Sequence, residues 1–226
     1  MLNIFIGYDR REIAAYQVCS YSIIKNSSVP VSITPINVRH IKDFRNNDYK
    51  ASTEFAFTRF LVPWLSEYKG HSLFMDCDML VRGDIKELFD CADGESDVQV
   101  VQHTYIPDEQ EKFLGAEQTI YERKNWSSVM LFNNEKCQRL SKHHVNRMGG
   151  LYLHQFGWAD KVGELPKTWN YLVGEMAEKF SDPQLVHFTR GGPYFEDYKD
   201  CEYADEWWQY WKEANSVLDT KILGSG

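Results

Sequence analysis

Two aspartates, Asp76 and Asp78, are the strongest candidates for chemistry in this 226-residue chain. They lie in the apolar run His71–Val81, and alternate residues of a β-strand lie on one face. Both carboxylates are therefore expected on the same face, flanked by Phe74 and Leu80. Two like charges so close repel, and a cation between them offsets the cost of burying them. The pattern predicts a Mn²⁺ or Mg²⁺ site that shares a substrate diphosphate.

A second candidate segment follows a short apolar run late in the chain. His187 comes directly after this run, and Gly191 and Gly192 follow it. An imidazole placed there can bind a metal, while the backbone N–H groups of the glycine turn can bind a phosphate. Arg190 adds the positive charge that a diphosphate needs. A buried core histidine before a turn is the alternative for this segment taken alone.

A third candidate is the end of the first apolar run, at Gly7, Tyr8 and Asp9. A glycine permits close approach of a ligand to the backbone. The Asp9 carboxylate can accept hydrogen bonds from a base N–H or a sugar hydroxyl. A helix cap is an equally good role for this aspartate.

The apolar spacing predicts the elements that must position these residues. Strands are expected at 4–6, 31–35, 73–81, 97–102 and 129–132, and helices at 14–26, 57–65 (interrupted by Pro63), 134–147 (capped by Asn134) and 207–214. Strand and helix alternate in the first half of the chain, so the predicted class is α/β, with ligands bound at the carboxyl ends of the strands.

Composition and charge narrow the possible partners. The formal net charge is −8, with 25 basic against 33 acidic residues, which argues against a general nucleic-acid binder. The sequence contains no apolar run long enough to span a membrane, and its first residues do not predict a signal peptide. The five cysteines are odd in number and form no C-x-x-C pair, which favours reduced thiols and a cytoplasmic location.

Together, these motifs resemble the GT-A-fold glycosyltransferases, and within them the glycogenin-like and bacterial galactosyltransferase group (family 8). The resemblance is clear at Asn3–Asn26, at Thr58–Phe60 leading into Phe74–Asp84, and at His187–Tyr194. It implies a Rossmann-like GT-A domain with a mixed, mostly parallel sheet flanked by helices over residues 1–195. Residues 196–226 are expected to form an acidic, Trp-rich helical tail packed on this body.

The resemblance also implies an activity and roles for single residues. The protein would transfer a sugar from a nucleotide sugar, usually UDP-linked, with retention at the anomeric carbon, to a glycan or lipid-linked acceptor. Mn²⁺ or Mg²⁺ would be bound by Asp76, Asp78 and His187. The nucleotide would be bound by Gly7, Tyr8, Asp9, Arg59, Asp76, Cys77, Gly191 and Gly192.

Three motifs depart from the family pattern. Trp126-Ser127-Ser128 stands where the family has Asn-Ala-Gly, and His154-Gln155 stands within its Asp-Gln-Asp. The late lysine of the family is absent, and Arg190 is expected to replace it on the diphosphate. The predicted catalytic residues are therefore Gln155 and Arg190. The residues expected on the donor or acceptor side are Ser127, Ser128, His154, Trp158 and Asp160. The Trp158 ring could stack on an acceptor sugar, and a place in the core is the commoner role for such a tryptophan.

Two other functions remain open at this stage. A non-catalytic relative with the same fold would bind a nucleotide sugar without forming a product. A haloacid-dehalogenase-like phosphohydrolase would use Asp76 as its nucleophile and would release phosphate from a simple aryl phosphate.

Overall fold

The computed structural model describes residues 1–44, 53–104, 123–176 and 180–216. The strands are β1 (Leu2–Gly7), β2 (Val31–Ile36), β3 (His71–Met75), β4 (Met79–Val81), β5 (Val98–Val100), β6 (Val129–Asn133), β7 (Val162–Glu164), β8 (Tyr171–Leu172) and β9 (Leu185–His187). The helices are α1 (Ile13–Asn26), α2 (Val62–Leu65), α3 (Ile85–Asp90), α4 (Lys142–Arg147), α5 (Gly150–His154) and α6 (Ala204–Ala214). Short 3₁₀ turns connect several of these elements.

The larger sheet has six strands in the order β2-β1-β3-β6-β5-β7. All neighbouring pairs are parallel except those that β6 makes with β3 and β5. Its central strands are buried on both faces, as in Ile4, Phe5 and Ile6 of β1, so they form continuous apolar runs. The mixed, mostly parallel sheet predicted from the sequence is confirmed.

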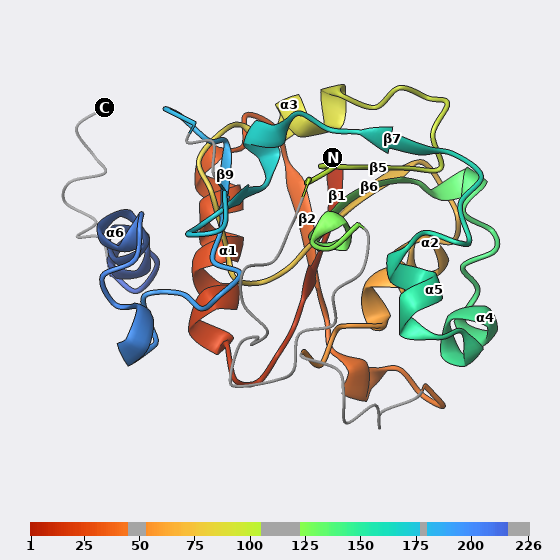
Figure 1. The fold of residues 1–226 in the computed structure, drawn as a ribbon, viewed down its shortest axis with the longest axis horizontal. Coiled ribbons are helices and arrows are strands. Elements are labelled where there is room, and N and C mark those ends of the chain that lie inside the picture. Colours follow the sequence, from red (N-terminus) through yellow and green to blue (C-terminus); the bar gives the residue numbers. More distant parts are fainter. Residues whose placement is uncertain (45–52, 105–122, 177–179, 217–226) are drawn as a thin grey trace.

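Helices cover both faces of this sheet. In Figure 1, α1 lies on one side of the sheet and α2, α4 and α5 lie on the other. Between them, one apolar cluster joins β1, β3, β5 and β6 to residues such as Phe60, Val145 and Trp158. The carboxyl ends of β1 and β3 thereby meet at one edge of the sheet, next to the start of β6.

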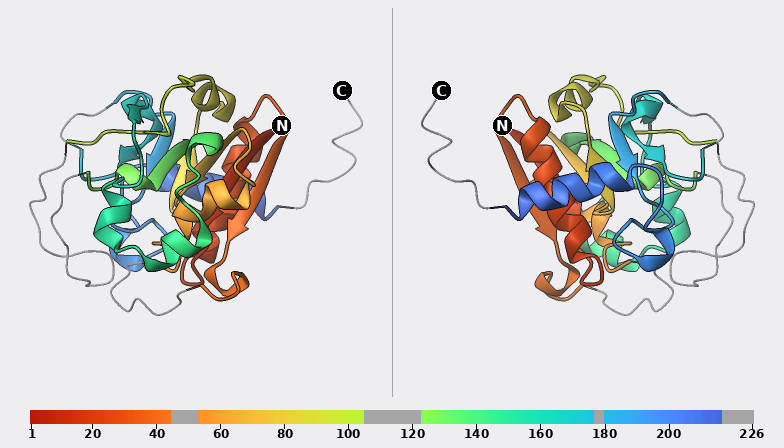
Figure 2. Two further views of the ribbon diagram at one scale, coloured as in Figure 1. Left: turned by 90° about the vertical axis from the view of Figure 1, so that its right-hand side faces the viewer. Right: turned by 90° about the vertical axis from the view of Figure 1, so that its left-hand side faces the viewer.

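Helix α6 packs on the outside of α1, which it crosses in Figure 2. Trp207 is fully buried, and the Tyr210 ring meets Tyr21 of α1 edge-on at 6.1 Å. Lys25 Nζ forms a 2.6 Å ion pair with Glu213 at the edge of the contact. The division of the chain at residue 195 stays a prediction.

None of the helices in the described part of the chain has both the length and the apolar character that a membrane span requires.

Two sequence expectations for local structure were wrong. Asn134 does not cap a helix, because its side-chain amide donates to Lys69 O and Ser72 Oγ and ties β6 to β3. The helix after it begins later, where the Ser141 side chain accepts from the N–H of His144. The hydrogen bonds of Asn134 to Lys69 and Ser72 join residues distant in the chain, so no local sequence pattern predicts them.

The two aspartates also lie differently from the prediction. Strand β3 ends at Met75, and Asp76 to Asp78 form the connection to β4, which belongs to the smaller sheet β4-β9-β8. Strand alternation therefore does not bring the carboxylates together. The passage of the chain from one sheet to the other does so.

We expect Gly7→Ala to destabilise the protein, because the new Cβ would lie 2.4 Å from the ring of the buried Phe55. Overpacking of this kind costs about 1–3 kcal/mol. For a chain of this size each 1 kcal/mol lowers the melting temperature by roughly 2–4 °C. Gly149→Ala is the matched control, since φ there is −67° and no described atom lies within 4 Å of the new Cβ. Equal thermal unfolding of the two variants would contradict this packing.

Candidate functional site

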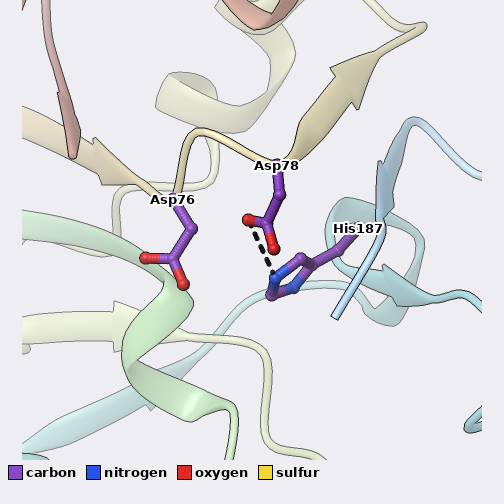
Figure 3. A group of neighbouring side chains, drawn as sticks. All are labelled: Asp76, Asp78 and His187. Carbon is purple, nitrogen blue, oxygen red and sulfur yellow. Dashed lines mark ion pairs between the residues drawn. The ribbon is translucent and has the colours of Figure 1, made fainter. Parts of the chain in front are cut away.

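Asp76, Asp78 and His187 converge at the edge where the two sheets meet (Figure 3). One potential ligand atom of each residue lies within 4.8 Å of the others, and this is the one such metal-binding group within the described residues. The pairing of Met79 with His187 between β4 and β9 brings the histidine beside Asp78. His187 Nε2 lies 3.4 Å from Asp78 Oδ1.

Arg59 holds the other aspartate in place. Its Nη1 lies 3.0 Å from Asp76 Oδ1 and donates to the backbone oxygen of Ser127 at 2.9 Å. The guanidinium lies over the rings of Phe55 and Phe74, at 5.2 and 5.1 Å from their centroids. Only 6% of Arg59 is exposed, so this charge acts on Asp76 with little screening by solvent.

The donor set of these three residues fits a hard divalent cation. Asp76 Oδ1 and Asp78 Oδ1 are both buried, and among the described residues neither receives a well-aligned hydrogen bond, although Arg59 Nη1 lies 3.0 Å from the former. Burial, opposed by Arg59 and reinforced by Asp78, raises the pKa of Asp76 to about 6. Burial alone would lower the pKa of His187, but the negative charges of Asp78 and Asp76 outweigh it and raise that pKa. Carboxylates beside one imidazole suit Mn²⁺.

Polar side chains continue from the imidazole into the protein. His187 Nδ1 lies 3.0 Å from Asn170 Oδ1, and Asn170 Nδ2 lies 2.8 Å from Ser128 Oγ. Ser128 in turn donates to the backbone oxygen of Asn125 at 2.7 Å. The Ser128 hydroxyl is therefore engaged inside the protein and not directed at a donor sugar. The sequence places Asn170 at the end of a segment dense in aromatic and polar residues, Trp158–Asn170, but nothing there indicates that this amide contacts His187.

Glu12 is a second buried group that the sequence did not reveal. It is 4% exposed, accepts from the Tyr194 hydroxyl at 2.8 Å, and lies 4.0 Å from the buried Sγ of Cys77. Burial and the nearby charge of Asp78 raise the pKa of Glu12 to about 8. Cys77 thus directs its side chain inward, away from any nucleotide. The sequence shows only that Glu12 precedes the helix expected at 14–26, and this position does not predict its burial.

Asp9 is surrounded by donors within its own loop. Its oxygens accept from the N–H and guanidinium of Arg11 and from the N–H of Glu54. Burial raises the pKa of Asp9, but these hydrogen bonds outweigh it, so the pKa is lowered. Tyr8 is half-buried beside Tyr16, with the rings edge-on at 5.5 Å. The helix-cap role that the sequence left open for Asp9 is wrong, because the N-cap residue of α1 is Glu12 and the Asp9 carboxylate accepts instead from Arg11 and Glu54.

Gly191 and Gly192, after His187, lie so close to neighbouring tyrosine rings that a side chain would not fit at either position. A Cβ on Gly191, whose φ is +132°, would lie 2.5 Å from the Tyr198 ring. A Cβ on Gly192 would lie 2.2 Å from the Tyr194 ring. The turn is thus packed against the segment that follows it.

Arg190 shares its surroundings with a buried lysine. Its Nε lies 3.7 Å from Glu175 Oε1, and Glu175 accepts from the Asn125 side chain at 3.2 Å. Lys124 is 8% exposed, and burial, partly offset by Glu175 and reinforced by Arg190, lowers its pKa. Arg123 and Asn125, on either side of it, have φ values of +65° and +64°. The structure therefore gathers two cations around Glu175, of which the sequence indicated only Arg190.

Ser127 and His154 form a direct contact. The Ser127 hydroxyl lies 2.7 Å from His154 Nδ1, and the imidazole meets Phe60 edge-on at 5.1 Å. Gln155 follows at the end of α5, half-buried, and its backbone oxygen accepts from Arg123 at 2.7 Å. Arg59 connects this group to the Asp76, Asp78 and His187 cluster because it contacts both Ser127 O and Asp76.

Trp158 and Asp160 are corrections to the sequence-based site. Trp158 is 2% exposed, stacks on Phe132 at 6.0 Å, and has no face open to an acceptor sugar. The N–H of Asp160 donates to Asp97, which adjoins β5 at the end where β3 begins, opposite Asp76. The Asp160 carboxylate is exposed and pairs with Arg139 at 2.7 Å.

The fold is shared with solved glycosyltransferases. The structure resembles the bifunctional glycosyltransferase WbbM, with a TM-score of 0.63 and 14% identity over 98% of this chain and 51% of that one. It also resembles the galactosyltransferase LgtC in complex with donor and acceptor sugar analogues, with a TM-score of 0.57 and 14% identity over 98% and 99%. The fold is that of the GT-A glycosyltransferases of family 8 type. This chain spans about half of WbbM.

Sequence comparison gives the nearer relationship. No protein-family model matches the chain. It is 47% identical over 225 residues to Protein CDI of Arabidopsis thaliana, covering 94% of this chain and 87% of that protein, and it belongs to the family of Protein CDI. The glycosyltransferase GlyF of Streptococcus pneumoniae is 21% identical over 147 residues, which are 61% of this chain and 37% of GlyF.

We expect Glu12→Gln to reduce the loss of stability of the metal-free protein as pH rises. The unfolded chain releases this proton near pH 4.5 and the folded protein near pH 8. Glu12 therefore contributes its full stability below pH 4.5 and loses it as the pH rises through 8. Glutamine cannot ionise but can still accept from Tyr194.

Thermal unfolding in EDTA across this pH range measures the effect. The melting temperature of Glu12→Gln relative to that of the wild type should rise by several degrees as the pH is raised to 8. Glu87→Gln, at an exposed position of α3, is the control and should run parallel to the wild type. Parallel curves for both variants would show that Glu12 is not a buried, protonated acid.

Proposed function

We propose that this protein is a metal-dependent glycosyltransferase that moves a sugar from a nucleotide sugar, UDP-linked, to a glycan or lipid-linked acceptor with retention. The observation that carries the proposal is the convergence of Asp76, Asp78 and His187 at the carboxyl end of β3 in a GT-A fold. LgtC, which shares the fold, was solved with donor and acceptor sugar analogues. The five free cysteine thiols support the predicted cytoplasmic location.

Asp76, Asp78 and His187 would hold Mn²⁺, or Mg²⁺ in its place. The cation, when bound, supplies positive charge to the departing diphosphate. Arg59 keeps Asp76 oriented through their 3.0 Å ion pair, and its own position is held by the oxygen of Ser127. The carboxylates thus meet the metal without having to reorganise.

Arg190 and Lys124 are the residues that we assign to the diphosphate. Both act on Glu175, whose negative charge keeps the two cations together in the absence of a ligand. Arg190 is partly exposed and can turn from Glu175 toward a phosphate, because the 3.7 Å contact is loose. This arrangement provides the charge that the missing family lysine would have supplied.

Ser127, His154 and Gln155 are the residues that we assign to the donor sugar. The Ser127–His154 hydrogen bond orients both side chains, and Arg59 places them beside Asp76. Ser127 and His154 occupy positions where the family has alanine and a carboxylate, so we expect a donor sugar different from the one that the family usually takes.

We predict that UDP binds only in the presence of Mn²⁺ and that Asp78→Ala weakens this binding at least about tenfold. Isothermal titration of UDP with and without Mn²⁺ measures both effects. Asp160→Ala is the matched control, because this carboxylate lies at the opposite end of the sheet. UDP binding that does not depend on Mn²⁺, or no UDP binding at all, would rule out the metal-dependent function. If UDP binding does require Mn²⁺, turnover of a UDP-sugar distinguishes an enzyme from a binding protein.

We predict that Arg190→Gln weakens UDP binding about tenfold while leaving binding of uridine unchanged, since charge-assisted hydrogen bonds to a diphosphate are lost. Arg139→Gln serves as the control, because Arg139 also pairs with a single carboxylate but lies beside Asp160. An equal loss of UDP and uridine affinity in Arg190→Gln would show that Arg190 does not act on the phosphates.

A further inference from the structure

A chain of hydrogen bonds determines which nitrogen of His187 carries its proton. It begins at the backbone oxygen of Asn125, which can only accept. Ser128 Oγ lies 2.7 Å from this oxygen, so the Ser128 hydroxyl must donate to it. With its proton engaged, Ser128 Oγ can only accept from Asn170, at 2.8 Å. The group that Asn170 turns toward Ser128 is therefore its NH₂.

The orientation of the Asn170 amide has independent support. Nδ2 of Asn170 also lies 3.5 Å from Asn125 O, so the same side of the amide faces two acceptors. Oδ1 then points at His187 Nδ1, 3.0 Å away, and can only accept. Nδ1 must carry the proton. All of Asn170 and 97% of His187 are buried, so water does not offer other partners.

The proton on Nδ1 determines the state of the other ring nitrogen, Nε2. In a neutral imidazole with the proton on Nδ1, Nε2 carries a lone pair, and here Nε2 faces Asp78 Oδ1 at 3.4 Å. A lone pair facing a carboxylate oxygen is unfavourable, and the contact becomes favourable when a proton or a metal cation lies between the two atoms. Metal-bound histidines commonly donate their other ring N–H to an oxygen, which fixes ring and tautomer.

We propose that Asn170 and Ser128 are positioning residues that hold His187 in the Nδ1–H tautomer, with Nε2 presented to a divalent cation shared with Asp78. The inference rests on the proposed metal-dependent function and assigns residues outside the ligand set. Ser128, placed by the sequence on the donor side, acts instead through Asn170. The left-handed backbone at Asn125, with φ +64°, brings its carbonyl oxygen to the start of the chain of hydrogen bonds.

Two substitutions at Asn170 separate positioning from packing. Asn170→Ala removes the acceptor and should raise the dissociation constant for Mn²⁺ by about 10–100-fold. Asn170→Asp keeps an oxygen opposite Nδ1, and the Ser128 hydroxyl can rotate to donate to the other oxygen. This variant should stay within about threefold of the wild type, since the acceptor role is preserved. Mn²⁺ alone is the probe, followed by the paramagnetic resonance signal of the free ion.

Asn134→Ala is a closely matched control. Asn134 is also fully buried, and its Nδ2 donates to a serine hydroxyl (Ser72, 2.9 Å) and a backbone oxygen (Lys69, 2.9 Å). It lies beyond the end of β6 that is remote from Asp76. Asn134→Ala should lower the melting temperature as Asn170→Ala does, while Mn²⁺ affinity stays at the wild-type value.

A spectroscopic measurement tests the tautomer without any metal. The ¹⁵N shifts of His187 in the metal-free wild type at alkaline pH should show a protonated Nδ1 and an unprotonated Nε2. In Ser128→Ala the amide is no longer held, and a mixture of tautomers is expected. This readout decides the inference even where Asn170→Ala fails to fold.

The inference is overturned by a proton on Nε2 in the wild type, by unchanged Mn²⁺ affinity in folded Asn170→Ala, or by an equal loss in Asn170→Asp. Failure of the proposed function looks different. There the wild type itself takes up no Mn²⁺, with or without UDP, while the ¹⁵N shifts still report the hydrogen bond to Asn170.

Discussion

Repulsion between Asp76 and Asp78 is the constraint on which the rest of the site depends. Two carboxylates in a nearly buried connection are costly unless positive charge lies beside them. Arg59 supplies one such charge at 3.0 Å from Asp76, and His187 approaches Asp78 to 3.4 Å. These partners come from a 3₁₀ turn before α2 and from the smaller sheet. The two sheets and the 3₁₀ turn before α2 thus meet at these charged side chains.

Two kinds of group surround the Asp76 and Asp78 carboxylates: aromatic rings that cover Arg59, and a buried acid, Glu12. Phe55 and Phe74 cover the guanidinium of Arg59, which leaves it few partners other than Asp76 and Ser127. On the other side, Glu12 is buried under Asp78 and is held by Tyr194, with its pKa raised. A proton on this acid keeps a third negative charge away from the pair. The Asp76 and Asp78 carboxylates therefore lie near both a buried cation, Arg59, and a buried acid whose pKa is raised, Glu12.

The departures from the family 8 pattern become intelligible in the structure. The Ser128 hydroxyl, which stands where that family has glycine, is used to orient Asn170 and, through it, His187. Ser127 and His154 replace alanine and a carboxylate together and contact each other at 2.7 Å. The missing lysine is matched by two cations, Arg190 and Lys124, around Glu175. Each change has a partner elsewhere in the fold, which argues for a reshaped site.

The sequence by itself determined the α/β class, strands at 4–6 and 129–132 that the structure extends by a few residues, and the residues that gather at the sheet edge. It could do so because continuous apolar runs and closely spaced carboxylates are local signals. Only the tertiary structure decided that Trp158 is core, that Asp160 lies at the far end of the sheet, and that Asn170 supports His187. These outcomes depend on contacts between segments distant in the chain, and such contacts leave no periodicity or spacing in the sequence.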